Sequence, residues 1–554
     1  MLQQKDLAMI RIHEIKLKAG QSEELLSARA ERKLGLQKGS LQAVRIVKES
    51  LDAREKPQVY RVFSLDLITD LSDEVLLKAA AAKKVKAQIA EELSYTPAPC
   101  LRVFETRPVV CGFGPCGIFA ALVLALYGAK PIVLERGACM EKRIEAVESF
   151  WRDGILSPVT NVQFGEGGAG TFSDGKLTTG TKDAAQRFVL QTFADAGASP
   201  SILYKNKPHI GTDVLRRVVV NIRKKIEALG GEVRFESEMT SLDIAQNRVC
   251  GLWVNEREYI KTDTVILALG HSARNTVRSL FEQGLRFEQK PFSMGVRIEH
   301  PQDLIDRAQL GASAGELGLM AADYKLNVKT KDGRGVYTFC MCPGGYVVAA
   351  ASQEGGVVTN GMSNSDRGGS NANAALLVDV RTDDFPSDHP LSGIQLQETY
   401  EKRCYEAAGA CYKAPCQTVG AFLGGHGRAD GNASKAGAVA ATYRPGVVTT
   451  DLRQCLPAFV CDAIAEALPL LDRKLHGFAM DGALMTAPET RSSAPFRMRR
   501  DEEGRVLNVL EQPIEGLYAG GEGAGYAGGI MSAAVDGLHL AEKAAKENRK
   551  PFRS

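Results

Sequence analysis

The clearest hydrophobic pattern of the chain lies at residues 109–135, VVCGFGPCGIFAALVLALYGAKPIVLE. The first apolar run predicts a short buried strand, the central run predicts a helix, and the last run, which ends at Glu135, predicts a second strand. A glycine turn, Gly112-x-Gly114-x-x-Gly117, separates the first strand from the helix. This order of strand, glycine turn, helix, strand and acid predicts a βαβ unit that binds a dinucleotide.

Each glycine of this turn has a physical role in such a unit. Gly112 allows the tight turn, Gly114 lets the backbone approach a pyrophosphate at the helix N-terminus, and Gly117 lets the helix pack close to the strand. Glu135, 18 residues after Gly117, stands where a carboxylate can accept hydrogen bonds from a ribose. The alternative is a glycine-rich turn in an ordinary βαβ unit.

The stretch before this unit has its own pattern of elements. It predicts strands at residues 8–19, 41–50 and 59–68 and helices at residues 22–34 and 72–93. This βαββα order predicts a small α+β domain over residues 1–97, with a slight excess of basic residues. Lys83, Lys84 and Lys86 form a cluster that could face RNA or protein, and a solvated helix face is the alternative.

A second glycine-rich loop follows at residues 163–180, QFGEGGAGTFSDGKLTTG. Its small residues, among them Gly168, Gly170 and Thr171, favour close backbone approach to a bulky planar or phosphorylated ligand. A loop of this length inside a compact domain is commonly functional, and an ordinary surface loop is the alternative.

A helix and several strands then return the chain to the sheet. The pattern predicts a helix at residues 212–229, a three-strand β-meander at residues 232–237, 248–254 and 258–261, and a buried strand at residues 262–270. His271 and Arg274 follow Gly270 at the carboxyl end of that strand, where ligands of open α/β sheets bind. Both are therefore candidate substrate-side or catalytic residues, and a helix cap is the alternative role.

Residues 290–450 change from helical periodicity to short strands separated by glycine. This pattern predicts an inserted, mainly β substrate domain, so that the dinucleotide-binding domain comprises residues 98–289 and 451–554. Within the insert, Arg367, His426 and Arg428 lie on glycine loops, and His426 and Arg428 are further candidate substrate-side or catalytic residues. The two arginines could bind an anionic substrate, and a role in the turn alone is the alternative.

The C-terminal stretch, residues 516–540, reads GLYAGGEGAGYAGGIMSAAVDGLHL. It predicts a strand, an acid at Glu522 and a helix that opens at Gly528 and Gly529. The acid could hold a ribityl hydroxyl, and the helix N-terminus could offset negative charge on a reduced flavin. This second anchor favours FAD over NAD as the dinucleotide.

Composition narrows the class of protein. A chain of 554 residues with 44% apolar and 24% charged residues is long enough for several soluble domains, and a net charge of +3 does not by itself indicate nucleic-acid binding. No apolar helix is long enough for a membrane and no targeting segment is visible, so we expect a cytoplasmic protein. The twelve cysteines lack the spacing of a disulfide scaffold or zinc site, so we expect free thiols and no metal.

Several of these motifs together resemble a known family. The GxGPxG turn, the LERG strand end, the LALG strand end and the GGEGAGYAGG helix start are similar to those of two-dinucleotide-binding-domain flavoproteins. More narrowly, QFGEGGAGTFSDGKL, LALGHSARNT, TFCMCPGG, ETRSSAPFR and GEGAGYAGGIMSAAVDG resemble a bacterial group of FAD-dependent dehydrogenases, FAD-dependent protein C. The resemblance covers nearly the whole chain. It implies FAD as cofactor, a redox role and a Rossmann-like FAD domain of the glutathione-reductase type, and it implies no particular substrate.

The resemblance also implies which residues contact FAD. They are Gly112, Gly114, Pro115 and Gly117 at the pyrophosphate, Glu135, Arg136 and Arg143 around the adenosine, Gly168, Gly170, Thr171 and Gly270 on the glycine loops, Gly521 and Glu522 at the ribityl chain, and Gly529 and Ile530 at the flavin ring. Glu522 stands where many relatives have Asp and is one methylene longer.

Two redox chemistries are disfavoured by the sequence. Disulfide reductases carry C-x4-C on the helix after the first acidic strand, where only Cys139 lies. Cys340 and Cys342 would share one face of a strand and are expected to pack. A second complete glycine fingerprint for NAD(P)H is missing, so NAD(P)H, as an electron donor, would have to visit the substrate cleft.

Two functions remain. The first is an FAD-dependent oxidoreductase that transfers a hydride between flavin N5 and an unidentified small molecule. The alternative is an FAD-dependent RNA-modifying or RNA-binding protein that uses residues 1–97 for recognition. The small charge excess of that domain favours the first function.

Overall fold

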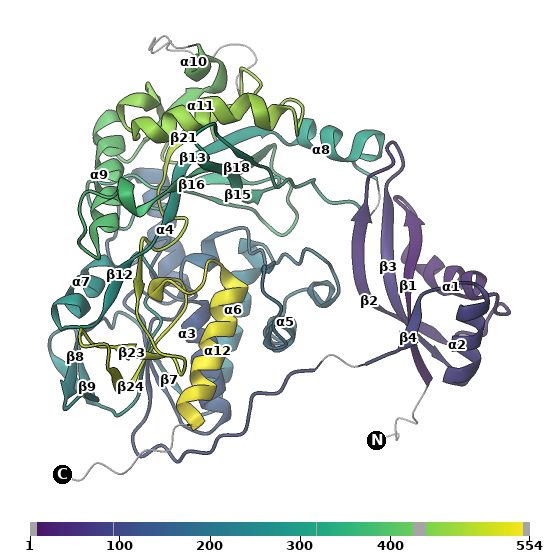
Figure 1. Ribbon diagram of the computed structural model, residues 1–554, viewed down its shortest axis with the longest axis horizontal. Helices are drawn as coiled ribbons and strands as arrows, with labels where there is room; N and C mark the ends of the chain where they lie inside the picture. The colour runs from purple at the N-terminus through teal and green to yellow at the C-terminus, as the bar shows by residue number, and fades with distance from the viewer. Residues whose placement is uncertain (1–7, 92–93, 317, 425–438, 547–554) are drawn as a thin grey trace.

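The computed structural model describes residues 8–91, 94–316, 318–424 and 439–546. The described chain is mixed α/β and is organised around a four-stranded, a nine-stranded and a seven-stranded sheet. Figure 1 shows the four-stranded unit to one side of the molecule, and the seven-stranded unit stacked above the nine-stranded unit.

The N-terminal unit is a βαββαβ sandwich. Its elements are β1 (Ala8–Lys18), α1 (Leu26–Leu34), β2 (Ala43–Asp52), β3 (Tyr60–Thr69), α2 (Asp73–Ala82) and β4 (Ala87–Ile89). The sheet order is β2-β3-β1-β4, and alternate residues of the strands, such as Ile10, Ile12, Leu65 and Leu67, are buried against the helices. The predicted helix at residues 72–93 was too long, because Lys84 takes φ +55° and the chain then pairs with β1.

The nine-stranded unit is built from elements on both sides of the large insertion. Its strands are β5 (Val109–Cys111), β6 (Ile132–Leu134), β7 (Glu232–Arg234), β8 (Met239–Ala245), β9 (Arg248–Val254), β10 (Glu258–Lys261), β11 (Val265–Leu267), β23 (Arg505–Leu507) and β24 (Pro513–Ala519). Its helices are α3 (Pro115–Leu126), α4 (Met140–Asp153), α5 (Ala185–Asp195), α6 (Thr212–Ala228), α7 (Arg274–Glu282) and α12 (Ile530–Lys546). The central order β24-β11-β5-β6-β7 is parallel, and the predicted βαβ unit is confirmed as β5, α3 and β6.

Each buried strand of this sheet packs on both faces. Val110 contributes to a core with α3, α5, α6 and α12, whereas its neighbours Val109 and Cys111 contribute to a core with α7 and the meander. The meander consists of β8, β9 and β10, so one of its predicted strands was wrong. The run at residues 232–237 instead supplies β7, which extends the parallel sheet.

The seven-stranded unit has the order β14-β15-β18-β13-β21-β19-β20. Its strands are β13 (Phe292–Pro301), β14 (Asn327–Lys329), β15 (Gly335–Cys342), β18 (Asn371–Val380), β19 (Ala414–Thr418), β20 (Val447–Thr449) and β21 (Leu484–Glu489), and its helices are α8 (Gln302–Leu310), α9 (Ser392–Ala407), α10 (Val419–Leu423) and α11 (Ala458–Asp472). Two short ladders complete the chain: β16 (Tyr346–Ala349) with β17 (Thr359–Met362), and β12 (Phe287–Gln289) with β22 (Phe496–Met498).

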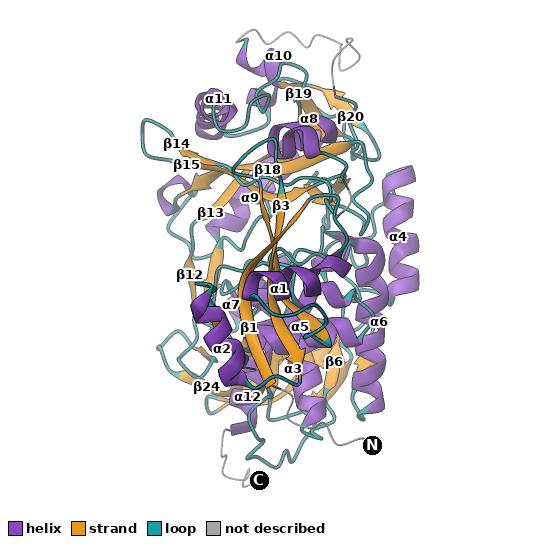
Figure 2. Cartoon of the chain, turned by 90° about the vertical axis from the view of Figure 1, so that its right-hand side faces the viewer, coloured by secondary structure: helices purple, strands orange, loops and turns teal. Residues whose placement is uncertain are grey.

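The insertion continues beyond the predicted boundary at residue 450. The apolar strand β21 lies in the middle of the seven-stranded sheet, paired with β13 and β19, and α11 covers that sheet. Figure 2 shows α10 and α11 at the outer end of this unit, away from the parallel sheet. The insertion is also less purely β than predicted, because α8, α9 and α11 all pack on its core.

The N-terminal unit is attached to the nine-stranded unit by an edge strand and by the linker. The N–H of Glu49 on β2 donates to the carbonyl of Tyr204, and the N–H of Asn206 donates back to the carbonyl of Glu49, both at 2.8 Å. In the linker, the hydroxyl of Tyr95 donates to Glu542 of α12 at 2.7 Å. Across the described part of the chain, every helix is too short or too polar to cross a membrane.

Candidate functional site

A cavity of about 810 Å³ is lined by residues of both large units. The nine-stranded unit contributes Gly112–Cys116, Glu135, Arg136, Gly168–Gly170, Gly270–Ala273, Gly520–Glu522 and Gly528–Ile530. The seven-stranded unit contributes Thr338–Met341, Val358–Asn360, Arg367, Glu489 and Arg491. Segments from distant parts of the sequence therefore share one binding space between the two sheets.

The glycine turn fits the pyrophosphate of a dinucleotide. Gly112 has φ +101°, and a Cβ at Gly117 would lie 1.9 Å from the carbonyl oxygen of Gly112. Gly114 is the N-cap of α3 and Pro115 its first residue, and no side chain caps the helix. The N-terminus of α3 therefore opens onto the cavity through its backbone, and its dipole favours an anion there.

Glu135, the predicted ribose ligand, also joins the two glycine loops. Its carboxylate accepts the N–H of Phe113 through Oε2 and the N–H groups of Gly137 and Gly165 through Oε1, each at 2.9 Å. An ionised carboxylate has about four acceptor positions, so one remains for a ribose hydroxyl. Beside it, the guanidinium of Arg136 lines the cavity and lies 4.2 Å from the centre of the Phe164 ring.

Arg143 does not lie at the adenine position that the resemblance implied. It is fully buried behind the second glycine loop and does not line the cavity. All five of its N–H groups donate to backbone carbonyls at 2.6–3.2 Å, those of Asn161, Val162, Gly165, Glu166 and Gly168. Burial lowers the pKa of Arg143 to about 9, so the guanidinium stays charged at neutral pH. Arg143 therefore shapes the loop rather than binding the cofactor.

Glu522 and His271 meet at the other end of the cavity. The Nδ1 atom of His271 lies 3.1 Å from Oε1 of Glu522, and both residues line the cavity. A Cβ at Gly528 or Gly529 would meet no atom within 4 Å, so the start of α12 borders open space with backbone alone. This arrangement suits a bulky planar group that approaches the helix N-terminus.

α3 and α12 are held together at the distance that this cavity requires. A Cβ at Gly537 would lie 2.0 Å from the carbonyl oxygen of Cys116, so the two helices cross in backbone contact. Because α3 begins at the glycine turn and α12 begins beside Glu522, this crossing fixes the spacing between the two ends of the cavity.

Cations and carboxylates meet where the second glycine loop faces the seven-stranded unit. Lys176 and Arg367 each lie 3.6 Å from Asp174, and Arg297 pairs with Glu489 at 3.0 Å. Burial favours a higher pKa for Asp174, but the neighbouring cations lower it overall. Lys176 and Arg367 therefore share one carboxylate, and the role of Arg367 in binding an anionic substrate stays a prediction.

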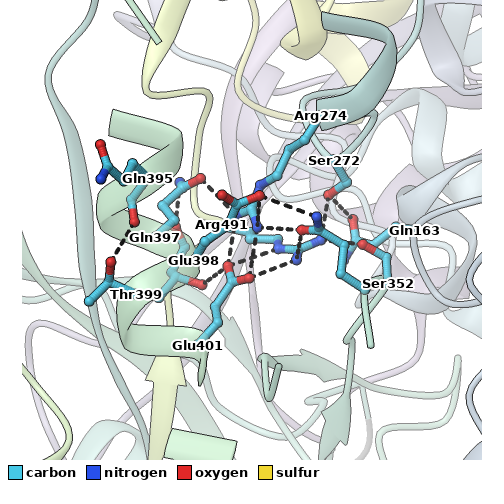
Figure 3. A network of polar contacts seen from close by, with 12 residues as sticks. Gln163, Ser272, Arg274, Ser352, Gln395, Gln397, Glu398, Thr399, Glu401 and Arg491 are labelled. Atoms are coloured by element: carbon cyan, nitrogen blue, oxygen red, sulfur yellow. Dashed lines mark hydrogen bonds and ion pairs between the residues drawn. The ribbon is translucent and has the colours of Figure 1, made fainter. Parts of the chain in front are cut away.

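Arg274, a predicted substrate-side residue, belongs to a buried network instead (Figure 3). Its two terminal nitrogens each donate to Glu401 of α9 at 2.8 Å, and Arg491 donates to the same carboxylate at 2.9 and 3.1 Å. Burial favours a higher pKa for Glu401, but the two guanidinium groups lower it overall. Arg274 starts α7 of the nine-stranded unit, so the network joins the two large units.

Arg491 extends this network to the cavity wall. Its Nη1 atom donates to the hydroxyl of Ser272 at 3.1 Å, and the Ser272 hydroxyl donates to Gln163 at 3.2 Å (Figure 3). Arg491, Ser272 and Gln163 all line the cavity. The network therefore links the second glycine loop, the strand end before α7 and the insertion.

The structure brings together most of the predicted cofactor residues. Those that line the cavity are Gly112, Gly114, Pro115, Glu135, Arg136, Gly168, Gly170, Gly270, Gly521, Glu522, Gly529 and Ile530, together with His271. Gly117, Arg143, Thr171 and Arg274 pack behind it. His426 and Arg428 lie outside the described residues. Asn360, Glu489 and Arg491 were not predicted as site residues, and only the ETRSSAPFR motif pointed to the last two.

Comparison with known proteins identifies the family. A family model described as "FAD-dependent protein, C-terminal domain-like" matches residues 291–492, and a model of a domain of unknown function matches residues 9–68. An uncharacterized protein of Clostridium beijerinckii is 44% identical over 534 residues, which cover 96% of this chain and 98% of the relative. The chain belongs to this family of FAD-dependent proteins. Its cofactor is FAD, and the uncapped glycine turn and the open start of α12 fit that cofactor.

Solved structures similar to this FAD-dependent protein are remote. CtdE in complex with FAD and substrate 4 is 13% identical, with a TM-score of 0.32 over 80% of this chain and 82% of that chain. The 3-ketosteroid-Δ4-(5α)-dehydrogenase of Rhodococcus jostii RHA1 is 12% identical, with a TM-score of 0.33 over 82% of this chain and 100% of that chain. At such scores neither similarity supports a reaction or substrate.

Proposed function

We propose that this chain is an FAD-dependent oxidoreductase that transfers a hydride between flavin N5 and a small molecule. The observation that carries the proposal is the shared cavity. It runs from the glycine turn, past Glu522 and the start of α12, to the wall of the seven-stranded unit. A substrate enclosed there would lie against the flavin end of the cofactor, as hydride transfer requires.

Different residues along this cavity are suited to different parts of the cofactor. The N-terminus of α3 would offset the charge of the pyrophosphate, and Glu135 would accept a ribose hydroxyl. Glu522, His271 and the backbone at the start of α12 would hold the ribityl and flavin end. FAD supplies the two-electron chemistry, and the protein supplies binding, orientation and electrostatics.

The wall opposite the cofactor indicates the kind of substrate. Lys176 and Arg367 share the carboxylate of Asp174, Arg297 pairs with Glu489 behind the lining, and Asn360 and Thr338 add uncharged polar groups to the lining. These groups favour a polar substrate over an apolar one.

Flavin absorbance under anaerobic conditions tests the reaction. Holoenzyme is mixed first with NADH and NADPH and then with a panel of small alcohols, amines, ketones and their reduced forms. Loss of the oxidised flavin spectrum with one of these compounds supports the proposal and identifies the donor. A flavin that dithionite reduces but that no member of the panel reduces or reoxidises would count against it.

Replacement of Gly114 by Glu tests the cofactor site separately. The Gly114→Glu side chain would place bulk and negative charge at the N-terminus of α3, where the pyrophosphate binds. We expect loss of FAD from the purified protein with little change in its circular dichroism. The matched control is Leu126→Glu at the exposed far end of the same helix, which should retain FAD. A Gly114→Glu protein with full FAD occupancy would exclude this binding mode.

The alternative function in RNA recognition gains no support from the contacts of the N-terminal unit. Arg11 and Arg45 both pair with Asp66 on the sheet, at 2.7 and 2.9 Å, so that part of the basic charge is neutralised internally. Salt-sensitive RNA binding that is lost on deletion of residues 1–97 would favour this alternative.

A further inference from the structure

Cys340, in the cavity wall, and Cys342, behind it, lie on a strained bulge. β15 changes register against β18 between Phe339 and Cys342, and Cys340 takes φ +42°. A left-handed conformation at a residue with a side chain is strained and persists only where the surroundings impose it. Cys340 and Cys342 are therefore not neighbours on one face of a regular strand, as the sequence alone predicts.

Contacts from the cofactor side and from the sheet hold this bulge. The ammonium group of Lys176, on the second glycine loop, donates to the carbonyl of Met341, between the two cysteines. On the other side, Nη1 of Arg297 donates to the carbonyl of Cys340 at 2.9 Å. The bulge is therefore anchored to the same loop that lines the cofactor end of the cavity.

The two thiols differ in access. Cys340 lines the cavity, whereas Cys342 is fully buried behind it, with its Sγ atom 3.2 Å from the carbonyl oxygen of Cys340. In a regular strand, Cα atoms two residues apart are about 6.6 Å apart, close to the upper limit of about 6.8 Å for a disulfide. On the bulge the chain turns back at Cys340, which brings the side chain of Cys342 against the backbone of Cys340.

The charges around the pair favour one thiolate. The hydrogen bond from Cys342 lowers the pKa of Cys340 and, with Arg297 and Lys176 nearby, overcomes the opposite effect of burial. Burial raises the pKa of Cys342 well above its usual value. An accessible thiolate with a neutral thiol beside it is the arrangement of a reactive dithiol, because the thiolate is the nucleophile in disulfide exchange.

We propose that Cys340 and Cys342 are a redox-active dithiol pair that exchanges electrons with the FAD of this cavity. The inference rests on the proposed function, since it requires a flavin at the cofactor end. In the oxidised pair, an S–S bond joins the two sulfurs. When reduced FAD delivers two electrons and two protons, this bond breaks, each sulfur becomes a thiol, and the FAD is left oxidised. In the reverse direction, the dithiol loses two electrons and two protons to oxidised FAD.

Mass spectrometry tests whether the pair forms a disulfide. Holoenzyme is oxidised with diamide, its remaining thiols are alkylated, and the peptide that contains both cysteines is analysed before and after reduction. We expect this peptide to lose both alkylation sites on oxidation in the wild type and to remain alkylated in Cys340→Ser and Cys342→Ala. The control is Cys411→Ser, which removes an exposed thiol and should behave as the wild type. Full alkylation of both cysteines after diamide would overturn the proposal.

An anaerobic dithionite titration tests the exchange with FAD. After diamide oxidation, the wild type should take up about twice as many electrons per FAD as Cys340→Ser. In the wild type, the disulfide should be reduced before the flavin or together with it. An equal uptake would refute the exchange even if the disulfide forms. Loss of FAD binding would instead refute the proposed function, and the alkylation result would be unaffected by it.

Discussion

Arg143 offers the sharpest test of how the second glycine loop is held. Replacement of Arg143 by Met keeps most of the length of the side chain and removes all five N–H donors. The five carbonyls of residues 161, 162, 165, 166 and 168 then lose their charged partner in a fully buried site. Because Gly168 and Gly170 line the cavity, we expect the substitution to weaken FAD binding although Arg143 does not face the cofactor.

The structure sets the size of the effect. Each buried carbonyl without a partner costs about 1–3 kcal/mol. The carbonyls of Gly165, Glu166 and Gly168 keep other donors, but those of Asn161 and Val162 lose the donor that Arg143 supplies, which costs about 2–6 kcal/mol, a large part of the stability of a domain. The loop would therefore open to water in the free protein and would have to be re-ordered by FAD. If only two carbonyls remain without partners in the complex, FAD binding loses about 2 kcal/mol or more. This corresponds to an affinity at least about 30-fold weaker.

Titration of the apoprotein with FAD, followed by quenching of flavin fluorescence, measures this loss. The matched control is Arg152→Met on the same helix, where the side chain is 71% exposed and pairs only with the adjacent Asp153. The control should bind FAD within about twofold of the wild type, because an exposed ion pair contributes little. If Arg143→Met also binds within about twofold and melts at the same temperature, the loop does not depend on Arg143 and the reasoning is wrong.

Two further substitutions test buried ion pairs that connect different segments of the fold. Glu401→Gln leaves the buried Arg274 and Arg491 without their carboxylate, and thermal denaturation should show a destabilisation of about 3–5 kcal/mol. The exposed Glu406→Gln on the same helix is its control, and equal melting temperatures for the two variants would contradict the prediction. His539 lies 2.9 Å from both Asp183 and Glu542; burial lowers its pKa, but the two carboxylates raise it overall above 6.5. Its stabilising contribution is therefore complete below pH 6.5 and is lost as the pH rises through the raised pKa. His539→Gln should remove this part of the pH dependence of the melting temperature, and an unchanged profile would assign the dependence to other groups.

The parts of the site that could be predicted from sequence are those set by neighbours in the chain. The turn from β5 into α3 depends on φ at Gly112 and on the absence of a Cβ at Gly117. Both glycines lie within one short segment of the sequence. Glu522 and the glycine start of α12 are local in the same sense. The residues that the sequence predicts for the two ends of the FAD site therefore lie against one cavity, and most of them line it.

The parts that could not be predicted depend on contacts between distant segments. Arg143 and Arg274 stand where an arginine of a surface helix would be solvated, and only the folded chain buries them against residues far away in sequence. β21 is an apolar run like the strands of the parallel sheet. The hydrophobic pattern alone does not show whether such a run pairs with β13 or joins the parallel sheet. Likewise, no local signal distinguishes the bulge at Cys340 from a regular strand.

Three buried guanidinium groups hold backbone segments around the cavity. Arg143, Arg274 and Arg297 are among the largest fully buried side chains of the described residues. Each holds a different segment beside the site: the second glycine loop, the Glu401–Arg491 network, and the wall at Glu489 and Cys340. Burial of a charge is costly, and an apolar replacement of a buried ion pair is often neutral or stabilising, so stability alone does not account for three such residues. A planar fork with five donors does what an aliphatic side chain cannot, because it binds several carbonyls or a carboxylate in one fixed geometry. The arginines therefore fix the positions of backbone segments around the cofactor. Lys keeps the positive charge but lacks the planar fork, so Arg143→Lys should bind FAD no more tightly than Arg143→Met.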